Sequence, residues 1–284
     1  MADLKKIGMV AGGGNMPIEI IKYCKEKGID IYVIGLEPFA SEDQLSGTPH
    51  SFAKIGEVGK MMKIFKSNNI NNIVLAGGIK RPSLKELIPD WVGMKILTKL
   101  AIKKMSDDNL FRAVINEIEK LGFKILGIEE VVPEMMFYEG VYGKVKPSKE
   151  DMNDIERGFV VAKALGAVDV GQAVVVQEGM VLAVEAIEGT DMMLSRASLV
   201  KKRGKAPIMV KVLKPKQDMR VDLPAIGLQT IELLKKYGIK GIAVEAGGVL
   251  LIERNAVIEK ANKAGVFIIG IKNNADLKNA NINI

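Results

Sequence analysis

Short apolar runs and helix-spaced apolar positions alternate through the first half of the chain. Lys6–Val10, Asp30–Ile34 and Asn72–Ala76 have the length and apolar character of strands, whereas Pro17–Lys27 is apolar at helical spacing. The order of strand, glycine-rich turn, helix and strand is typical of a Rossmann-like half. We therefore predict an N-terminal Rossmann-like domain with a parallel sheet over residues 1–134.

The pattern changes in the second half of the chain. Residues 135–147 lose the regular periodicity and are rich in glycine, tyrosine and basic side chains, which indicates a linker. Beyond the linker, Gln172–Gln177 and Met180–Ala186 flank the turn Glu178-Gly179 and predict a hairpin. Residues 148–284 are thus expected to form a mixed α/β domain, and the fold class is α/β with two domains.

The sequence also predicts where the side chains of Trp91 and His50 lie. Trp91 and Ile96 stand at core spacing within the predicted helix Asp90–Lys104, so both are expected to be buried. His50, in GTPHSF, is expected to lie in a loop.

The composition is that of a globular protein, with 48% hydrophobic and 5% aromatic residues. No apolar run reaches the roughly 18–20 residues that a membrane-spanning helix needs. The first residues, MADLKKIGMVAGGG, reach a glycine-rich turn too early for a signal peptide. We therefore expect a cytoplasmic protein.

The single cysteine and the single histidine limit the available chemistry. One cysteine forms no disulfide within the chain, and Cys24 is expected to fill the core. A zinc site with two or more histidines is excluded, and a Ser-His-Asp triad would have to use His50. Catalysis must therefore depend on Asp, Glu, Lys, Arg and hydroxyl groups, and a metal cofactor should be oxygen-ligated Mg²⁺ or Mn²⁺.

Basic residues outnumber acidic ones, 41 to 34, and give a formal net charge of +7. Such an excess favours anionic partners such as nucleotides or an acidic membrane surface, although it also fits an ordinary solvated surface. Nucleic acid is disfavoured because the basic residues are scattered and few aromatic residues accompany them.

Two stretches place carboxylates near predicted helix starts. In VLAVEAIEGTDMMLSRA (residues 181–197), Thr190 and Asp191 are candidate helix caps. In VDLPAIG (residues 221–227), Asp222 precedes Pro224, which fits the first residue of a helix that continues to Lys236. Helix N-termini also favour phosphate, so these stretches suggest a divalent metal that holds a phosphorylated ligand.

The glycine-rich turn AGGGNMP fits a binding role only in part. Gly12 and Gly14 match the first two glycines of a dinucleotide-binding fingerprint, but Pro17 occupies the third position. The turn can still approach a phosphate or ribose. Lys80 and Arg81, in GGIKRP, are expected at the carboxyl edge of the sheet, where they either contact phosphate or form a solvated basic turn.

Six motifs together resemble the LpxI type of UDP-2,3-diacylglucosamine pyrophosphatase. They are AGGGNMP, GGIKRP, SDDNLFRAV, VLAVEAIEGTDMMLSRA, VDLPAIG and VEAGGVLLIE. The resemblance extends from Ile7 to about Ile271, and the C-terminal motifs are the specific ones. It implies the Mg²⁺-dependent hydrolysis of UDP-2,3-diacylglucosamine to 2,3-diacylglucosamine 1-phosphate and UMP, by attack of water on the β-phosphorus, in lipid A biosynthesis. It also implies a homodimer.

The resemblance matches Asp222 to the essential aspartate of the family, as a metal ligand or as the residue that activates water. We further expect Asp191 and Glu185 to be catalytic, with Asp191 and Asp222 binding the metal. The expected substrate-binding residues are Gly12, Gly13, Gly14, Lys80, Arg81, Thr190, Arg196, Arg220, Glu245 and Gly247.

A lipid substrate adds two expectations. Met135, Met136 and Phe137 could line an apolar cleft for the acyl chains, and the protein should visit the inner membrane surface transiently. The alternative function is a non-catalytic nucleotide- or sugar-nucleotide-binding protein. A nicotinamide-dependent reductase is disfavoured by Pro17 and by the lack of a His or Tyr proton donor.

Overall fold

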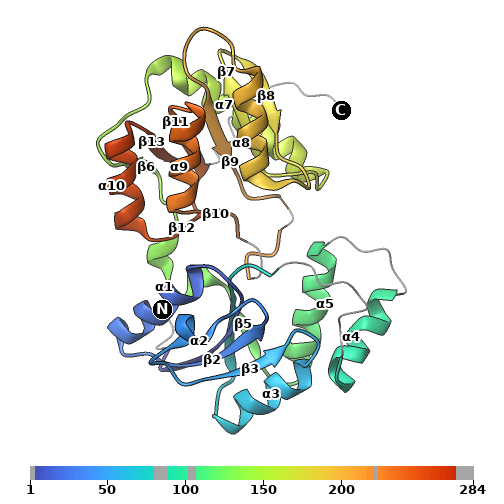
Figure 1. The fold of residues 1–284 in the computed structure, drawn as a ribbon. Helices are drawn as coiled ribbons and strands as arrows, with labels where there is room; N and C mark the ends of the chain where they lie inside the picture. Colours follow the sequence, from blue (N-terminus) through green and yellow to red (C-terminus); the bar gives the residue numbers. More distant parts are fainter. Residues whose placement is uncertain (1–3, 80–88, 102–106, 216, 221–222, 273–284) are drawn as a thin grey trace. The chain divides into compact units, whose positions relative to one another are not determined.

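The structure is a computed structural model that describes the whole chain except residues 1–3, 80–88, 102–106, 216, 221–222 and 273–284 (Figure 1). The chain divides into two compact units. Unit 1 comprises Met1–Pro133 and Asp218–Asp222, and unit 2 comprises Glu134–Gln217 and Leu223–Ile284.

Unit 1 contains the predicted parallel sheet. All neighbouring strands are parallel, in the order β3-β2-β1-β4-β5. The strands β1 and β4 meet at the centre, where their carboxyl ends form the expected ligand-binding edge of such a sheet. The strands are β1 (Lys6–Ala11), β2 (Asp30–Glu37), β3 (His50–Lys54), β4 (Asn72–Ala76) and β5 (Lys124–Leu126).

One face of this sheet carries the main core of unit 1, where Phe65, Ile96 and Ile115 pack with strand residues. Trp91 was expected in this core, but it is 84% exposed because it is the first residue of its helix and faces solvent. Cys24 is fully buried, as predicted, and burial raises the pKa of its thiol to about 11. The helices are α1 (Met16–Lys27), α2 (Glu42–Leu45), α3 (Val58–Ser67), α4 (Trp91–Ala101), α5 (Asp107–Lys120) and α6 (Ile128–Val131).

His50 begins strand β3, so its predicted loop placement is wrong. Its ring contacts the Thr48 carbonyl oxygen at 2.7 Å and the Glu42 carboxylate at 2.9 Å. The single histidine is thus engaged locally at one edge of the sheet of unit 1.

Unit 2 contains a mixed six-stranded sheet in the order β6-β13-β11-β9-β7-β8. Strands β9, β11 and β13 are parallel, and β7 and β8 form the predicted hairpin, with positive φ at Glu178 (49°) and Gly179 (79°). The strands are β6 (Gly140–Tyr142), β7 (Ala173–Gln177), β8 (Met180–Val184), β9 (Ile208–Lys211), β11 (Gly241–Glu245) and β13 (Phe267–Ile271), with a separate pair, β10 (Ala225–Ile226) and β12 (Leu250–Leu251).

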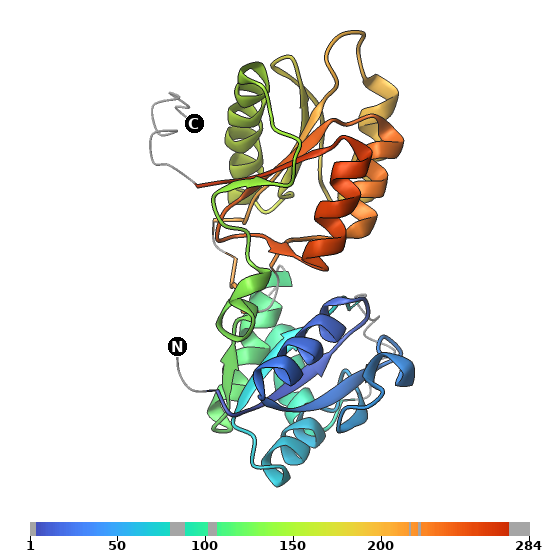
Figure 2. The ribbon, with the colours of Figure 1, turned by 90° about the vertical axis from the view of Figure 1, so that its left-hand side faces the viewer.

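Helices cover both faces of this sheet (Figure 2). Helix α7 packs on one face through Ile155 and Phe159, and α8, α9 and α10 pack on the other. Gly158 lets α7 approach β9, because a Cβ atom there would lie 2.3 Å from a methyl carbon of Val210. The helices are η1 (Pro133–Met135), α7 (Lys149–Ala167), α8 (Gly189–Val200), α9 (Leu228–Tyr237) and α10 (Arg254–Ala264).

The segment expected as an acyl-binding linker is packed instead. Met135, Met136 and Phe137 are all buried, and the Phe137 ring meets the Tyr142 ring edge-on at 4.8 Å in the core of unit 2. These three side chains therefore present no surface to a ligand in this structure, contrary to the expectation that they line an acyl-binding cleft.

Candidate active site

The carboxyl edge of the sheet in unit 2 brings together several of the predicted site residues. Strands β8, β9, β11 and β13 end at this edge, and α8, α9 and α10 begin there (Figure 1). Ligands of open α/β sheets bind at such an edge, where helix N-termini face the ligand.

A buried polar network joins this edge to α8. The Thr190 hydroxyl donates to Glu185 Oε1 at 2.5 Å, and Lys211 Nζ donates to Thr190 Oγ1 at 3.0 Å. Glu185 and Lys211 are each only 7% exposed. A carboxylate, a hydroxyl and an ammonium group are thus held together at the end of β9 and the start of α8.

Close packing of two loops fixes the Glu185 carboxylate. A Cβ atom on Gly171 would lie 2.0 Å from the Glu185 carbonyl oxygen, so only glycine permits this approach. The neighbouring amide of Gln172 donates to Glu185 Oε2 at 3.2 Å. The loop before β7 therefore orients the carboxylate that follows β8.

The predicted capping roles of Thr190 and Asp191 are wrong. Helix α8 begins at Gly189, so both residues lie within its first turn, and the preceding residue, Glu188, makes no side-chain capping bond. Thr190 bonds to Glu185 instead, while Asp191 is exposed and accepts from Gln229 Nε2 at 2.8 Å. Asp191 thus links the first turns of α8 and α9.

The predicted helix start at Pro224 is also wrong. The next two residues form β10, which pairs with β12, and α9 begins only at Leu228. The Pro224 carbonyl oxygen accepts from the Leu250 amide at 2.8 Å, so tertiary pairing extends this segment where a local signal favoured a helix.

Glu245 lies at the same edge but on the opposite face of the sheet. Its carboxylate accepts from Lys163 Nζ of α7 at 2.5 and 2.7 Å and from the Leu213 amide at 2.8 Å. Glu245 is 8% exposed. The structure therefore separates Glu245 from the network of Glu185, Thr190 and Lys211.

Gly247, just beyond β11, has a positive φ of 75° and donates its amide to the Phe137 carbonyl oxygen.

Arg196 and Arg220, both expected to clamp pyrophosphate, have protein partners. Arg196 bonds to the Val184 carbonyl oxygen at 2.8 Å and pairs with Glu188. Arg220 binds Asp218 through two nitrogens, at 2.8 and 2.9 Å, and Glu119 of α5 at 2.9 Å. The hydrogen bond from Arg220 lowers the pKa of Asp218. Arg220 thus anchors the segment 218–220 within unit 1.

The glycine-rich turn of unit 1 is bonded to the turn after β4. The amides of Gly12 and Gly13 donate to the carbonyl oxygens of Ala76 and Gly78, and the Gly78 amide returns a bond to Gly13 at 2.9 Å. These two amides are thus used within the protein. Gly14 is exposed at the start of α1, with a φ of 88°.

Three expected site residues, Asp222, Lys80 and Arg81, lie outside the described residues. Across the described residues, no group of three or more His, Cys, Asp or Glu side chains is arranged to hold a metal ion. Asp191 alone offers an exposed carboxylate near the network, so the described residues do not by themselves fit a divalent metal.

The pattern of the sequence missed two lysines, Lys163 and Lys211. Lys211 ends the strand sequence IMVK, and a charged residue at the carboxyl end of a buried parallel strand could have identified it. Lys163 looked like one of several polar residues on α7, and only the tertiary contact with Glu245 distinguishes it.

Within the described residues, none of the helices is both long and apolar enough to cross a membrane.

Comparison with known proteins gives one family. The LpxI N-terminal domain matches residues 6–135, and the LpxI C-terminal domain matches residues 138–269. The UDP-2,3-diacylglucosamine pyrophosphatase LpxI of Caulobacter vibrioides is 41% identical over 275 residues, which cover 94% of this chain and 98% of that protein.

Likeness to solved structures is weak. CobK precorrin-6A reductase has a TM-score of 0.32 at 10% identity, covering 94% of this chain and 88% of that chain. The biotin carboxylase subunit of pyruvate carboxylase has a TM-score of 0.27 at 14% identity, covering 61% and 34%. These two likenesses carry no argument. With both LpxI domains matched in order along nearly the whole chain, the protein belongs to the LpxI family.

Proposed function

We propose that this protein hydrolyses UDP-2,3-diacylglucosamine to 2,3-diacylglucosamine 1-phosphate and UMP, in lipid A biosynthesis. The observation that supports this proposal most strongly is the 41% identity to a UDP-2,3-diacylglucosamine pyrophosphatase over nearly the full length of both chains. The buried network of Glu185, Thr190 and Lys211 at a ligand-binding edge supplies a place for the chemistry.

In the proposed reaction, water attacks the β-phosphorus, which is nearer the sugar. A new bond joins the water oxygen to this phosphorus, and the bond from it to the bridging oxygen breaks. The bridging oxygen and its electron pair leave with UMP, and the proton of the water is released. Negative charge therefore grows on the leaving phosphate, where a nearby cation lowers the barrier.

Lys211 is the cation that we assign to this charge. Its ammonium group lies at the carboxyl end of β9, beside the first turn of α8, whose N-terminal amides also favour phosphate. Thr190 holds Lys211 and Glu185 in one hydrogen-bonded chain, so it acts as a positioning residue. Asp222 keeps its proposed role as metal ligand or water-activating residue.

Mg²⁺, or Mn²⁺ in its place, is the proposed cofactor, with Asp222 and Asp191 as its ligands. A divalent cation would neutralise phosphate charge. Removal of divalent ions with a chelator, followed by readdition, tests this part of the proposal by activity and by the binding of ⁵⁴Mn.

Transient binding to the inner membrane surface and a homodimer also belong to the proposal. The first follows from a lipid substrate, and the second from the family resemblance. Sedimentation velocity of the purified protein tests the homodimer, since a single species with the mass of one chain would contradict it.

The test of the function is the hydrolysis of UDP-2,3-diacylglucosamine in water enriched in ¹⁸O, with and without Mg²⁺. We expect release of UMP, with the label on the sugar phosphate, and loss of turnover in Asp222→Ala. Label on UMP would instead place the attack on the α-phosphorus. Binding of UDP-sugars without turnover would favour the non-catalytic binding protein.

A further inference from the structure

The amino edge of the sheet in unit 2 differs from its carboxyl edge in the exposed basic side chains that surround it. Strands β9, β11 and β13 begin there, and α8, α9 and α10 end there. The three helix ends carry a dense set of exposed basic side chains. They are Lys201, Lys202 and Arg203 after α8, Lys235 and Lys236 at the end of α9, and Lys263 at the end of α10.

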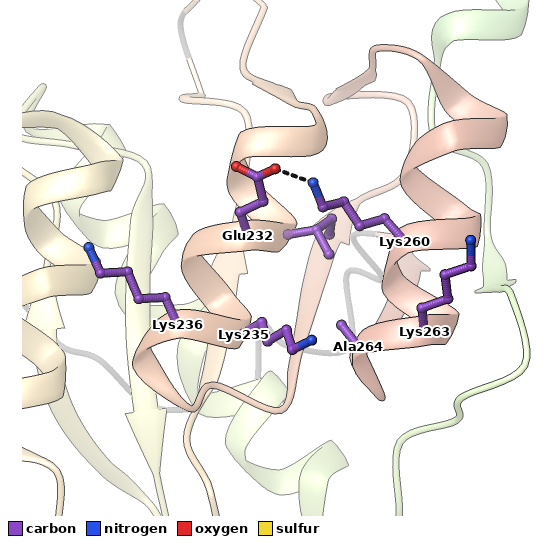
Figure 3. Close-up of a pocket in the computed structure, with 7 residues that line it drawn as sticks. Glu232, Lys235, Lys236, Lys260, Lys263 and Ala264 are labelled. Carbon is purple, nitrogen blue, oxygen red and sulfur yellow. Dashed lines mark hydrogen bonds and ion pairs between the residues drawn. The ribbon is translucent and has the colours of Figure 1, made fainter.

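A groove of about 530 Å³ runs between the ends of α9 and α10 (Figure 3). Its floor includes the apolar side chains of Ile231 and Ala264, and its rim carries lysines. Lys235 extends from α9 toward α10, and Lys260 extends from α10 to Glu232 (Figure 3). An apolar floor with a cationic rim fits an anionic amphiphile better than a simple anion.

Only part of this positive charge is neutralised within the protein. Lys260 pairs with Glu232, and Lys263 pairs with Glu259 at 2.5 Å. Among the described residues, no carboxylate pairs with the five remaining cations. They are Lys201, Lys202, Arg203, Lys235 and Lys236.

Apolar side chains stand beside these cations. Leu199 is 83% exposed and Val200 is 48% exposed, and both immediately precede Lys201. Lysines at helix C-termini are explained by the helix dipole alone, but exposed aliphatic side chains in the same last turn are not. Cations flanking exposed aliphatic groups are typical of segments that bind an anionic lipid surface.

We infer that this basic end, formed by the C-terminal ends of α8, α9 and α10, docks unit 2 on the anionic surface of a phospholipid bilayer. The five cations face lipid phosphates, Leu199 enters the acyl boundary, and the groove accepts one lipid headgroup. The choice of a bilayer as partner rests on the proposed lipid substrate. The carboxyl edge, with Glu185 and Lys211, lies at the opposite end of the parallel strands and stays uncovered.

Vesicle binding of the full chain tests the inference without any turnover. Wild type should co-sediment with vesicles that contain phosphatidylglycerol and not with phosphatidylcholine alone, and 1 M salt should release it, because the screening length falls to about 3 Å. The variant Lys201→Gln/Lys202→Gln/Lys235→Gln/Lys236→Gln should partition roughly 100- to 1,000-fold more weakly, since each basic residue contributes about fivefold. Leu199→Ser should weaken binding by about threefold to tenfold.

The matched control removes four exposed lysines of unit 1: Lys6, Lys22, Lys63 and Lys66, each changed to Gln. This control has the same net charge and should bind within about twofold of wild type, which separates a local surface from total charge. Turnover of a dispersed short-chain substrate should be unchanged in both variants, which also shows that they fold.

Three results would overturn the inference. They are equal loss of binding in both lysine variants, no binding of wild type to anionic vesicles, or salt-resistant binding that is lost in Ile187→Ser. Ile187, at the opposite edge, is fully exposed, and the last result would place the membrane contact there. Since binding is measured without substrate, vesicle binding with no hydrolysis would refute only the proposed function.

Discussion

The carboxyl edges of the two sheets differ in the groups that form them: backbone groups in unit 1 and charged side chains in unit 2. In unit 1, the edge between β1 and β4 is made of backbone: Gly13 and Gly78 exchange two hydrogen bonds, and the Gly12 amide donates to the Ala76 carbonyl oxygen. In unit 2, the corresponding edge carries charged side chains that are almost fully buried, Glu185, Lys211 and Glu245. Buried charge is costly unless it is paired, so these three groups depend on the hydrogen bonds that hold them at this edge.

The contrast suggests a division of labour within one chain. A backbone turn with little side-chain bulk lets a ligand approach closely, which suits binding. In unit 2, a cation and a carboxylate are joined through a hydroxyl group. Such charged groups can stabilise the charge that develops on a substrate during reaction, which suits catalysis. Four substitutions test this contrast, beginning with the largest expected effect.

Lys211→Met removes the buried cation while keeping the length of the side chain. We expect kcat to fall roughly 100- to 1,000-fold, because charge on the leaving phosphate loses its stabilising group. KM should change much less. Lys205→Met, at an exposed site, is the control and should leave kcat within about twofold of wild type. Equal kcat values for the two variants would remove Lys211 from the mechanism.

Glu245→Ala breaks the ion pair on the opposite face of the sheet. It leaves the Leu213 amide without its acceptor and Lys163 with the Leu213 carbonyl oxygen but without its carboxylate, and we expect the free energy of unfolding to fall by about 2–3 kcal/mol. Urea unfolding measures this loss. The double variant Lys163→Met/Glu245→Met should recover part of it, because no lone charge remains. Since Glu245 lies apart from Lys211, kcat of the folded Glu245→Ala protein should fall less than that of Lys211→Met.

Gly77→Ala tests the backbone-built edge of unit 1. Gly77 has a φ of 96°, and a Cβ atom there would lie 2.8 Å from the Gly13 carbonyl oxygen. We expect a loss of about 1–3 kcal/mol in the free energy of unfolding. Gly78→Ala is the matched control, because a Cβ atom there meets nothing within 4 Å. Similar losses in both variants would contradict a specific close approach at Gly77.

Glu129→Gln should have the smallest effect on stability. It tests a partly buried carboxylate in unit 1. Burial raises the pKa of Glu129, and its Oε2 atom is buried without a hydrogen-bond partner among the described residues. A raised carboxyl pKa gives stability that is present below the ordinary value of 4.5 and is lost as pH rises through the folded-state pKa. The variant should therefore melt slightly above wild type at pH 7, and the advantage should disappear near pH 4.

The sequence pattern predicted a segment correctly where the local preference of its residues and its tertiary contacts favour the same structure. The apolar run Asn72–Ala76 is the observed β4, and the Glu178-Gly179 turn connects the predicted hairpin. Strand β4 lies between β1 and β5 in the sheet, so its apolar composition and its environment give the same answer.

The failures occur where tertiary contacts override a local signal. Pro224 fits a helix start, but pairing of β10 with β12 takes the next residues into a strand. Thr190 fits a cap, but α8 begins one residue before it, and its hydroxyl donates to the buried Glu185 instead. Lys211, which donates to Thr190, comes from a strand 21 residues further along the chain, and periodicity contains no information on such a pair.

The most direct test of the proposed site is hydrogen–deuterium exchange of Asp222→Ala with and without UDP-2,3-diacylglucosamine. This variant is chosen because we expect it to bind the substrate without turnover. Protection should appear in the segment around Glu185–Asp191 and at the end of β9, where Lys211 lies. Substrate binding with no change in exchange at either segment would contradict the assignment of catalysis to the carboxyl edge of unit 2.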